Sequence, residues 1–565
     1  MILILLIWCY LGITFFNVGF AFNKLLRIKE LDAALTLVFG MFCITLFASF
    51  WAIFGRINYE FQVALILFQL LVVVKYKIEL SASYYHIFQR IREINSFLKI
   101  YFLVTSIVIL FQSAGNSFFV DNETYYIQTI KWLNEYGLVP GLANLHIFFG
   151  QTSGWHILQS VFSFSYLANY NNDLNGFLLL FVVGFSISKL DSYFKTSNFQ
   201  LLWIGLLPMM LVLLIPFSGA PSPDLAVILI SILLFYYFLK RNENPSTDAL
   251  TILSLLAFFV VYIKVAALPI LSLPLIYYIS HFHEKQTETI PTRIIGVAVL
   301  TAFIIKNTLL TGYPLYPSSL FVDYFNSDKT IPKTLYEFWW NGAKNYDFVV
   351  SQSEYFKLSC FEILSKWATS SWFTIVLTIT ISLLILLFPF TIRKFKNKNS
   401  FWIIYLTMIT QIVFLVATTP QHRFVLPFLL FFGLLLFSLL LAKKTPIYVT
   451  LYTVLALASI FVLFPTAIGK NHSQIDFYPA KFSLSQLVLP QQNSNLRAAF
   501  STKSKSNLKY NSPDEHSYIW VTGDGKLPCV NTRQIEYFEK NLGYIPQLRG
   551  ATLANGFYSK KVDKP

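Results

Sequence analysis

The stretch Ile375–Phe390, which reads IVLTITISLLILLFPF, decides the fold class because it contains no charged side chain. Leu201–Pro216 and Phe428–Ala442 are apolar runs of the same kind. A helix of about 20 apolar residues crosses the ~30 Å hydrocarbon layer of a bilayer. Inside that layer no water is present to satisfy backbone polar groups, so a spanning segment of this kind must be helical. We therefore predict an integral membrane protein built of helices.

The composition supports the same class. Of the 565 residues, 55% are hydrophobic and 13% are charged, and the mean hydropathy is +0.58. A soluble protein normally carries about 25% charged residues. The first residues, Met1–Phe22, are apolar and have neither a basic flank nor a small-residue cleavage site. We therefore predict a first membrane helix there rather than a removed signal peptide.

The net charge of +15 follows a pattern typical of membrane topology. Most of the Lys and Arg residues lie in short loops between apolar segments and in the tail. Such loops face the cytoplasm by the positive-inside rule. Because topology accounts for the charge, we predict no nucleic-acid partner.

The apolar segments predict about 14 transmembrane helices in an all-α polytopic fold. They are residues 2–22, 33–54, 60–75, 98–112, 172–189, 200–216, 224–239, 250–263, 265–281, 294–310, 372–390, 401–417, 424–442 and 446–464. Basic residues occur in alternate loops, which we place inside. These loops hold Lys24, Arg27 and Lys29; Lys75, Lys77, Arg90, Arg92 and Lys99; Lys189 and Lys195; Lys240 and Arg241; Lys285 and Arg293; Arg393, Lys394, Lys396 and Lys398; and Lys443 and Lys444.

This assignment places both termini and all large loops outside the cytoplasm. It also requires residues 250–281 to form a hairpin of two short helices around Lys264, because a single crossing would break the alternation. The predicted organisation is transmembrane helices in 1–112, an outer loop in 113–171 with a surface helix, a transmembrane core in 172–310, a second outer loop in 311–371, transmembrane helices in 372–465 and an extracytoplasmic α/β or irregular tail in 466–565. Cys360 and Cys529 both fall in outer segments, where a disulfide between them is one alternative.

The first outer loop holds the candidate catalytic residues, Asp121 and Glu123, at the start of a short amphipathic helix. An N-terminal Asp or Glu also suits helix capping and the helix dipole, so a purely structural role stays open. Farther along the loop, Asn144, His146 and His156 supply hydrogen-bonding groups near the bilayer surface. Imidazole groups there could contact phosphate or hydroxyl groups of a substrate, or be satisfied structurally.

Three basic side chains are further candidates for substrate binding. Lys264 lies among apolar residues, where a lysine is costly unless it faces water, a carbonyl group or an anion, although it can also extend to the membrane surface. His422 and Arg423 lie at the outer end of a membrane helix. The planar guanidinium of an arginine can donate two parallel hydrogen bonds to a phosphate. No spacing typical of a metal site is present.

The acidic first outer loop, the short broken helices around Lys264 and the sequence Arg423–Pro427 resemble the GT-C class of integral-membrane glycosyltransferases. Two features differ from that class: four predicted crossings precede the acidic loop, and Asn122 separates the acidic pair. The stretches Tyr126–Trp155, Thr311–Pro317, Leu527–Cys529 and Gly543–Phe557 resemble an uncharacterised family of bacterial multispanning membrane proteins, which has no assigned activity.

The GT-C resemblance implies an inverting transfer of a sugar from a polyprenyl-phosphate donor to a cell-surface glycan or glycolipid. Asp121 would be the base toward the acceptor hydroxyl, and Glu123 its assistant or a ligand of Mg²⁺ or Mn²⁺. Arg423 and Lys264 would hold the lipid phosphate as it leaves. The membrane implied is the bacterial inner membrane, so the expected partners are membrane lipid, the donor and the acceptor.

Other functions remain open at this stage. A polysaccharide polymerase or ligase would use outer-loop arginines more than a carboxylate. A transporter or flippase would need ionisable residues in the middle of the membrane and two related halves, and the sequence shows little of either. An assembly protein of the cell envelope would tolerate the loss of Asp121.

Overall fold

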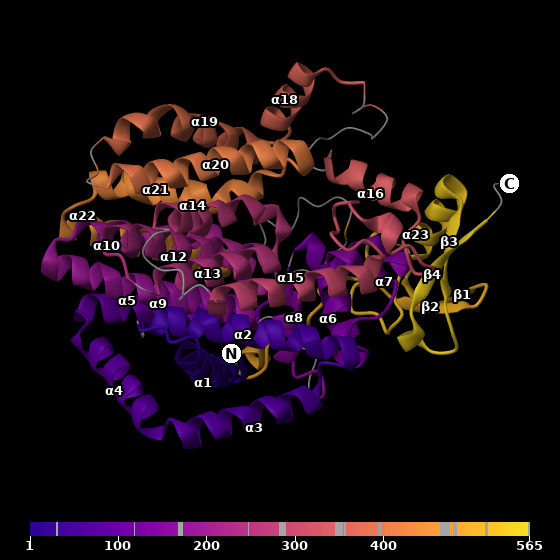
Figure 1. The fold of residues 1–565 in the computed structure, drawn as a ribbon, viewed down its shortest axis with the longest axis horizontal. Coiled ribbons are helices and arrows are strands. Elements are labelled where there is room, and N and C mark those ends of the chain that lie inside the picture. Colours follow the sequence, from indigo (N-terminus) through magenta and orange to yellow (C-terminus); the bar gives the residue numbers. More distant parts are fainter. Residues whose placement is uncertain are drawn as a thin grey trace.

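The computed structural model describes residues 1–29, 32–117, 119–167, 173–246, 248–281, 290–344, 354, 357–393, 395, 397–463, 475, 477, 483–514 and 518–562. Within these residues the chain forms a bundle of long helices that run lengthwise in Figure 1, with loops and the C-terminal tail at one end. Three predicted cytoplasmic residues, Lys285, Lys394 and Lys396, lie outside the described residues.

The helices of the bundle coincide with the predicted apolar segments. They are α1 (Ile2–Leu25), α2 (Ala33–Phe54), α3 (Tyr59–Lys75), α5 (Ser96–Ala114), α9 (Asp173–Thr196), α10 to η4 (Phe199–Gly205 to Ile215–Gly219), α12 (Pro223–Glu243), α13 (Ala249–Ile263), η5 (Val265–Leu271) with α14 (Ser272–Ser280), α15 (Ile290–Thr311), α19 (Trp372–Ile392), α20 (Lys398–Thr418), η9 (His422–Val425) with α21 (Leu426–Leu440), and α22 (Lys444–Leu463). Another helix, α4 (Lys77–Glu93), is largely exposed and joins α3 to α5.

Eleven helices of the described residues are long and apolar enough to cross a membrane. The chain is therefore a helical, multi-pass membrane protein, as predicted. The remaining helices of the predicted 14 are shorter: α3 has 17 residues, α13 has 15, and η5 with α14 spans Val265–Ser280. Whether these three cross the whole layer stays a prediction.

The tightest contact between helices joins α1 and α2. A Cβ atom on Gly19 would lie 1.8 Å from the carbonyl oxygen of Thr36, and one on Gly40 would lie 1.9 Å from that of Phe15. Only glycine permits the two backbones to approach so closely, as at many interfaces between membrane helices.

The chain reverses direction at Lys264, as the charge alternation requires. At the start of α13, Asp248 accepts a hydrogen bond from the Lys29 backbone N–H at 2.9 Å, near the end of α1. At the other end of α13, Lys264 pairs with Asp224 at the start of α12. The following helix, α14, contacts α13 and brings Tyr277 close enough to Arg241 to interact electrostatically. Since Arg241 lies at the end of α12, α14 returns toward the end from which α13 came.

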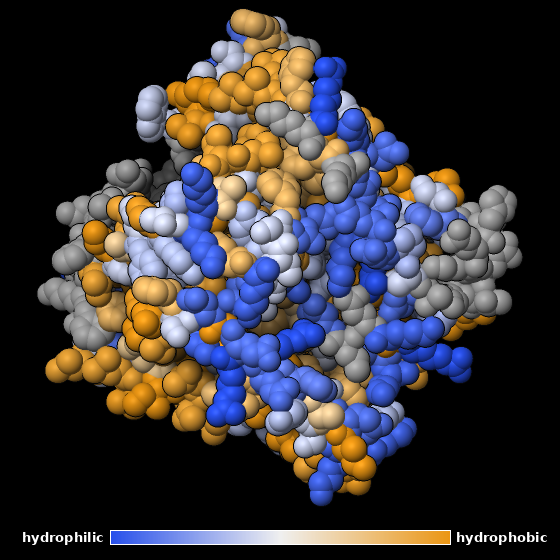
Figure 2. Space-filling view, turned by 90° about the vertical axis from the view of Figure 1, so that its left-hand side faces the viewer, coloured by the Kyte–Doolittle hydropathy of each residue, from blue (hydrophilic) through white to orange (hydrophobic). Residues whose placement is uncertain are grey.

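The basic turns gather at one end of the bundle. Lys189 pairs with Asp32 at 3.5 Å, Lys195 pairs with Asp191 at 2.7 Å, and the same Asp191 accepts a hydrogen bond from the backbone N–H of Asn95 at 3.0 Å. Figure 2 faces this end of the molecule and shows hydrophilic side chains across its centre, with apolar side chains toward the edges. Turns that are far apart in the sequence thus share one face, as their charge predicts.

The loops predicted to lie outside gather at the opposite end. They contain η1 (Asn122–Tyr126), α6 (Ile127–Glu135), α7 (Leu142–Leu145), η2 (Ile147–Gln151), α8 (Gly154–Val161), η8 (Val322–Tyr324), α16 (Lys333–Lys344) and α18 (Cys360–Thr369). The two large loops contact each other, because Asn144 Nδ2 donates to the carbonyl oxygen of Lys329 at 2.7 Å. The short loop 418–423 joins them, since Thr419 Oγ1 donates to the carbonyl oxygen of Ala343 at 3.2 Å.

The tail forms a small cap with two antiparallel hairpins at the same end (Figure 1). Its elements are β1 (Phe500–Lys505), β2 (Leu508–Pro513), α23 (Thr532–Tyr537), η13 (Phe538–Leu542), β3 (Tyr544–Leu548), η14 (Leu553–Asn555) and β4 (Phe557–Lys561). The earlier part of the tail contains η12 (Leu484–Leu487). The backbone N–H of Phe557 donates to Pro140 at 2.9 Å, and Arg549 pairs with Asp328 at 2.7 Å. The N-terminal ammonium of Met1 donates to the carbonyl oxygen of Gln486 at 2.5 Å, so the start of α1 contacts η12 of the tail.

A disulfide between Cys360 and Cys529 was one alternative that the sequence left open. Cys529 is buried with a free thiol, which donates to the carbonyl oxygen of Thr522 at 3.2 Å. The side chain of Cys360 lies outside what the structure describes. We conclude that the two residues do not form a disulfide here.

Labelling in cells tests which end faces the cytoplasm. In a protein whose four native cysteines are replaced by alanine, Thr502→Cys lies exposed in β1 and Lys443→Cys lies exposed at the basic end. The positive-inside rule predicts that a membrane-impermeant maleimide labels the cysteine at 502 in spheroplasts and the cysteine at 443 only after permeabilisation. Labelling of both positions without permeabilisation would contradict the proposed sidedness.

Candidate active site

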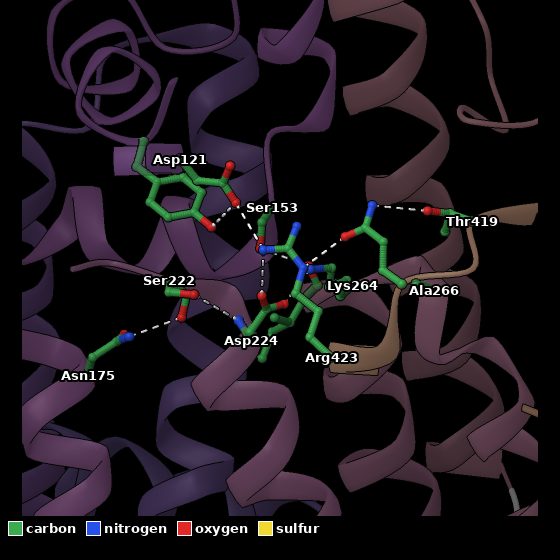
Figure 3. Close-up of polar contacts among 12 residues, drawn as sticks. Asp121, Ser153, Asn175, Ser222, Asp224, Lys264, Ala266, Thr419 and Arg423 are labelled. Atoms are coloured by element: carbon green, nitrogen blue, oxygen red, sulfur yellow. Dashed lines mark hydrogen bonds and ion pairs between the residues drawn. The ribbon is translucent and has the colours of Figure 1, made fainter. Parts of the chain in front are cut away.

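Four charged side chains meet where the loops join the bundle: Asp121, Asp224, Lys264 and Arg423 (Figure 3). Arg423 Nη1 lies 3.2 Å from Asp121 Oδ2 and 3.4 Å from Asp224 Oδ2, so one guanidinium group bridges two carboxylates. Asp224 also pairs with Lys264 through its other oxygen. The cluster therefore holds two positive and two negative charges.

Each charged residue is placed by the end of a helix. Asp121 directly precedes the π-helical turn η1, and Asp224 lies in the first turn of α12. Lys264 ends α13 with an extended backbone, and Arg423 lies in η9 immediately before α21. Helix N-termini carry partial positive charge, so the starts of α12 and α21 favour an anion at this place. A charged group at a helix end also avoids the hydrocarbon interior, where it would be costly.

A buried hydrogen-bond network fixes the start of α12. Ser222 Oγ accepts a hydrogen bond from the backbone N–H of Asp224 at 3.4 Å. Asn175 Nδ2 donates to the carbonyl oxygens of Ser222 at 3.0 Å and Phe217 at 2.9 Å, and the indole N–H of Trp155 donates to Asn175 Oδ1. The turn 217–224 is therefore rigid, which keeps the Asp224 carboxylate in position.

The cluster is partly open on its cationic side. The exposed fractions of the side chains are 30% for Arg423 and 23% for Lys264, but 16% for Asp121 and 4% for Asp224. Arg423 Nε donates to Gln421 Oε1 at 2.8 Å, which directs the guanidinium group. Lys264 Nζ and the Arg423 guanidinium lie 4.0 Å and 5.3 Å from the ring centre of Phe424. Two ordered cations at a partly open site can bind an oxyanion through charge-assisted hydrogen bonds.

Tyrosine rings lie against the carboxylate of Asp121. The hydroxyl of Tyr126 donates to Asp121 Oδ2 at 3.3 Å. The ring of Tyr126 lies 4.8 Å from the ring of His156, and that of Tyr125 lies 5.9 Å from it. Burial raises the pKa of both tyrosines well above 10, so Tyr126 remains a hydrogen-bond donor at neutral pH.

Glu123 is two residues from Asp121 but faces the tail. Its carboxylate accepts hydrogen bonds from Ser494 Oγ at 2.6 Å and the Asn495 backbone N–H at 2.9 Å. Its carbonyl oxygen accepts from the backbone N–H groups of Thr522 and Gly523, both at 2.8 Å. The side chain is completely buried. Glu123 thus fastens the loop that carries Asp121 to the cap, and the structure does not bring its carboxylate into the charged cluster.

Lysine and glutamine side chains of α6 extend this attachment. Lys131 Nζ pairs with Asp524 at 2.8 Å, and Gln128 Nε2 donates to the carbonyl oxygens of Gly523 at 3.1 Å and Gly525 at 2.8 Å. The turn 522–525 of the tail is therefore held by three consecutive helical turns of the first loop. The position of Asp121 depends on the tail through these contacts.

Asn144 and His146, both predicted to bind substrate, join the loops to the cap. Asn144 Oδ1 accepts a hydrogen bond from Ser559 Oγ at 2.7 Å, while its Nδ2 donates to Lys329 of the second loop and to Gly141 of its own loop. His146 Nε2 lies 3.2 Å from the carbonyl oxygen of Trp520, and its other ring nitrogen accepts from the backbone N–H of Phe148 at 3.3 Å. Burial lowers the pKa of His146 to about 4, so it is neutral.

His156 and His422 lie closer to the cluster. His156 is completely buried in the first turn of α8, where its Nδ1 accepts a hydrogen bond from the backbone N–H of Ser153 at 3.4 Å, and its Nε2 has no hydrogen-bond partner among the described residues. Burial, then the charges of Lys306 and Lys264, lower its pKa to about 3. His422 precedes Arg423, but its ring stacks on Trp367 at 4.1 Å and lies 3.0 Å from Thr378 Oγ1, between α18 and α19.

The described residues contain no group of three or more His, Cys, Asp or Glu side chains that could hold a metal ion. Glu123, the predicted ligand of Mg²⁺ or Mn²⁺, has both carboxylate oxygens engaged by hydrogen-bond donors of the protein. The involvement of either metal stays a prediction.

Several residues in or near the cluster were not among the predicted site residues. At Asp224, which directly precedes an apolar run, the sequence alone favours a helix N-cap. In the structure Ser222 is the N-cap of α12, and Asp224 lies in the first turn and pairs with both cations. Tyr126 and Gln421 carry no sequence signal beyond their closeness to Asp121 and Arg423. Lys306 is buried in α15 and donates to the carbonyl oxygen of Thr152, next to α8. A lysine within an apolar helix was the signal that could have identified it.

Comparison with protein families gives one result. A family model described as a domain of unknown function, DUF8201, matches residues 1–430. The chain belongs to this family. The match runs from α1 to the first residues of α21 and includes all four charged residues of the cluster. It does not include the cap formed by the tail. No curated protein and no solved structure matches this DUF8201 chain.

The stability of the cap is expected to depend on pH through Glu123. Burial raises the pKa of this carboxyl group to about 7, so the folded protein holds the proton more tightly than the unfolded chain does. The contribution to stability is therefore present at low pH and is lost as the pH rises from about 4.5 to about 7. Between pH 5 and pH 8 we expect the apparent Tm of the wild type to fall by about 5 °C more than the apparent Tm of Glu123→Gln does.

The matched control is Glu536→Gln, which removes an exposed carboxylate from α23 of the same cap. Thermal unfolding of the full chain in lipid nanodiscs, followed by intrinsic fluorescence, gives the Tm values. If Glu123→Gln and Glu536→Gln show the same pH dependence, the buried carboxyl group is not the source of the effect.

Proposed function

We propose that this DUF8201 protein is a GT-C-type glycosyltransferase. It transfers a sugar from a polyprenyl-phosphate donor to a cell-surface glycan or glycolipid on the outer face of a bacterial inner membrane. Support comes from one observation above all: the Arg423 guanidinium lies between Asp121 and Asp224, with Lys264 beside it, at one end of a lipid-facing bundle. That arrangement offers a base and an anion-binding pair next to the place where a lipid phosphate would enter.

The two cations are the proposed phosphate-binding groups. Arg423 can present a planar fork of N–H donors to phosphate oxygens, and Lys264 adds a compact charge. Both side chains are the more exposed members of the cluster. Asp224 orients them, because it pairs with both and is itself held by the capped start of α12. As the donor loses its sugar, the leaving phosphate gains a negative charge, which the cations stabilise.

Asp121 is the proposed general base. One of its carboxylate oxygens takes the proton of the acceptor hydroxyl as that oxygen forms a bond to the anomeric carbon. The bond from the anomeric carbon to the phosphate oxygen breaks at the same time, and its electron pair remains on the polyprenyl phosphate. Attack from the opposite face inverts the configuration of the anomeric carbon. Tyr126 keeps Asp121 in place through its hydroxyl group.

The placement of charge favours this mechanism over transport. Asp224, Lys264 and Arg423 all lie at the ends of helices, and Lys306 lies five residues before the end of α15. A transporter would need its ionisable residues near the middle of the membrane. The alternative is a polysaccharide polymerase or ligase, which could also use Arg423. Unlike the proposed transferase, such an enzyme would not require Asp121.

Replacing the base tests the proposal. Asp121→Asn keeps the shape of the side chain but removes its ability to accept a proton, so we expect the transferase rate to fall about 100-fold or more. In cells that lack the chromosomal copy, a plasmid encoding the variant should fail to restore the surface glycolipid, as measured by mass spectrometry. Asp323→Asn, which changes an exposed carboxylate of the second loop, is the matched control and should restore it. A normal glycolipid with Asp121→Asn at wild-type protein level would exclude the catalytic role.

A binding measurement tests the phosphate site separately. Arg423→Lys retains the charge but lacks the planar fork, so we expect about tenfold weaker binding of undecaprenyl phosphate to the protein in nanodiscs. Arg549→Lys makes the same exchange at an arginine of the cap that pairs with Asp328, and should bind like the wild type. Equal affinities of the two variants for undecaprenyl phosphate, measured by native mass spectrometry, would show that Arg423 does not bind the phosphate.

A further inference from the structure

A row of five aromatic rings runs from the first outer loop to the surface of the cap. Its members are Tyr125, Phe148, Trp520, Phe338 and Tyr537. Successive ring centres are separated by 5.7 Å from Tyr125 to Phe148, 4.9 Å from Phe148 to Trp520, 6.3 Å from Trp520 to Phe338 and 5.7 Å from Phe338 to Tyr537. Three segments that are far apart in the sequence supply these rings: the first loop, the second loop and the tail.

One end of the row lies at the charged cluster. The ring of Tyr125 is 4.7 Å from that of Tyr126, whose hydroxyl donates to Asp121. The other end is at the surface, where Tyr537 has an exposed fraction of 39%. The three rings between them are partly exposed and none is fully buried. An elongated molecule on this row would therefore reach from solvent to the proposed base.

The row is held rigidly from behind. His146 approaches the carbonyl oxygen of Trp520, and α16, which carries Phe338, is fastened by stacked pairs of rings. In these pairs Tyr313 lies 4.7 Å from Tyr336, and Tyr316 lies 4.8 Å from Trp339. Binding to a preformed surface costs little ordering of side chains.

We propose that this row is the binding surface for a carbohydrate acceptor, an inference that rests on the proposed transferase function for its direction. The faces of sugar rings carry apolar C–H groups, which pack on aromatic faces, while their hydroxyl groups point to the rim. Sites of this kind combine aromatic walls with a few polar groups. Glu337 and Lys333 are exposed polar side chains on α16, the helix that carries Phe338.

A saccharide suits the row better than a lipid does. The rings belong to the loops and the cap, which lie at the end of the bundle opposite to the basic turns (Figure 1). Trp520 and Tyr537 come from the tail, whose described residues contribute none of the candidate membrane spans. The row thus lies where an acceptor glycan can approach from water while the lipid donor enters from the bundle.

Binding of glycan to the full chain in nanodiscs tests this inference. The probe is a mixture of lipid-free oligosaccharides released by mild acid from the surface polysaccharide of the producing cells, and native mass spectrometry measures the bound fraction. We expect Trp520→Leu and Tyr537→Ala to weaken binding about tenfold, because each removes a stacking face. Trp520→Phe should recover most of the affinity. Trp372→Leu, the same exchange at a tryptophan of α19 that is 79% exposed, is the matched control and should bind normally.

The outcomes separate the inference from the proposed function. Asp121→Asn should bind the oligosaccharides within about twofold of the wild type while lacking transferase activity. Normal binding by both Trp520→Leu and Tyr537→Ala would overturn the inference even if Asp121 proves catalytic. The absence of binding to the wild type would also overturn it. Should Trp520→Leu lower the Tm of the protein, Tyr537→Ala decides the question, because Tyr537 is the most exposed ring of the row and its loss leaves the packing behind the row in place.

Discussion

The guanidinium group of Arg423, bound between the carboxylates of Asp121 and Asp224, is the contact on which the arrangement of this molecule depends. It joins two segments that are 302 residues apart, and it brings the first loop, the start of α12 and the start of α21 to one place. The cost of burying charge in hydrocarbon explains why these groups meet at the end of the bundle. The ion pairs with Lys264 and Arg423 also explain why the Asp224 carboxylate can be almost completely buried there. An unpaired carboxylate would be strongly disfavoured in such a place.

The cap belongs to the same construction, because the loop that carries Asp121 has its other attachment in the tail. Glu123 receives hydrogen bonds on its carboxylate and on its carbonyl oxygen from two separate stretches of the tail. Lys131 and Gln128 continue this contact along α6. A carboxylate that acts as a general base, the role proposed for Asp121, must be held within a fraction of an ångström of its working position. The buried Glu123 therefore contributes to the site by position, whereas the GT-C resemblance implied a direct chemical role for it.

The sequence predicted the bundle well and the site in part, for physical reasons that differ. Hydropathy is a local property, so each apolar segment could be found without knowing its neighbours, and the alternation of basic turns revealed which ends lie together. Lys264 and Arg423 could be selected because a charge beside an apolar run is costly wherever it lies. Asp224 was missed as a partner because an acidic residue at the start of a helix has a sufficient local explanation in capping or in the helix dipole. The contacts of Glu123, Asn144 and His146 with the tail could not be foreseen, since nothing local records a partner some 370 to 415 residues away.

The pairing within the cluster has a consequence for the order of events in the proposed reaction. In the structure Asp121 Oδ2 accepts hydrogen bonds from the Arg423 guanidinium group and from the Tyr126 hydroxyl group, so this oxygen is already occupied. A lipid phosphate that takes the guanidinium N–H donors would compete with Asp121 for them. The carboxylate would then be released toward the acceptor only when the donor is bound. Asp224 would keep Lys264 and Arg423 in place during this exchange, because it pairs with both cations and is fixed by the cap of α12. On this mechanism, the same ion pair that assembles the site from distant segments also prevents Asp121 from acting before the donor arrives.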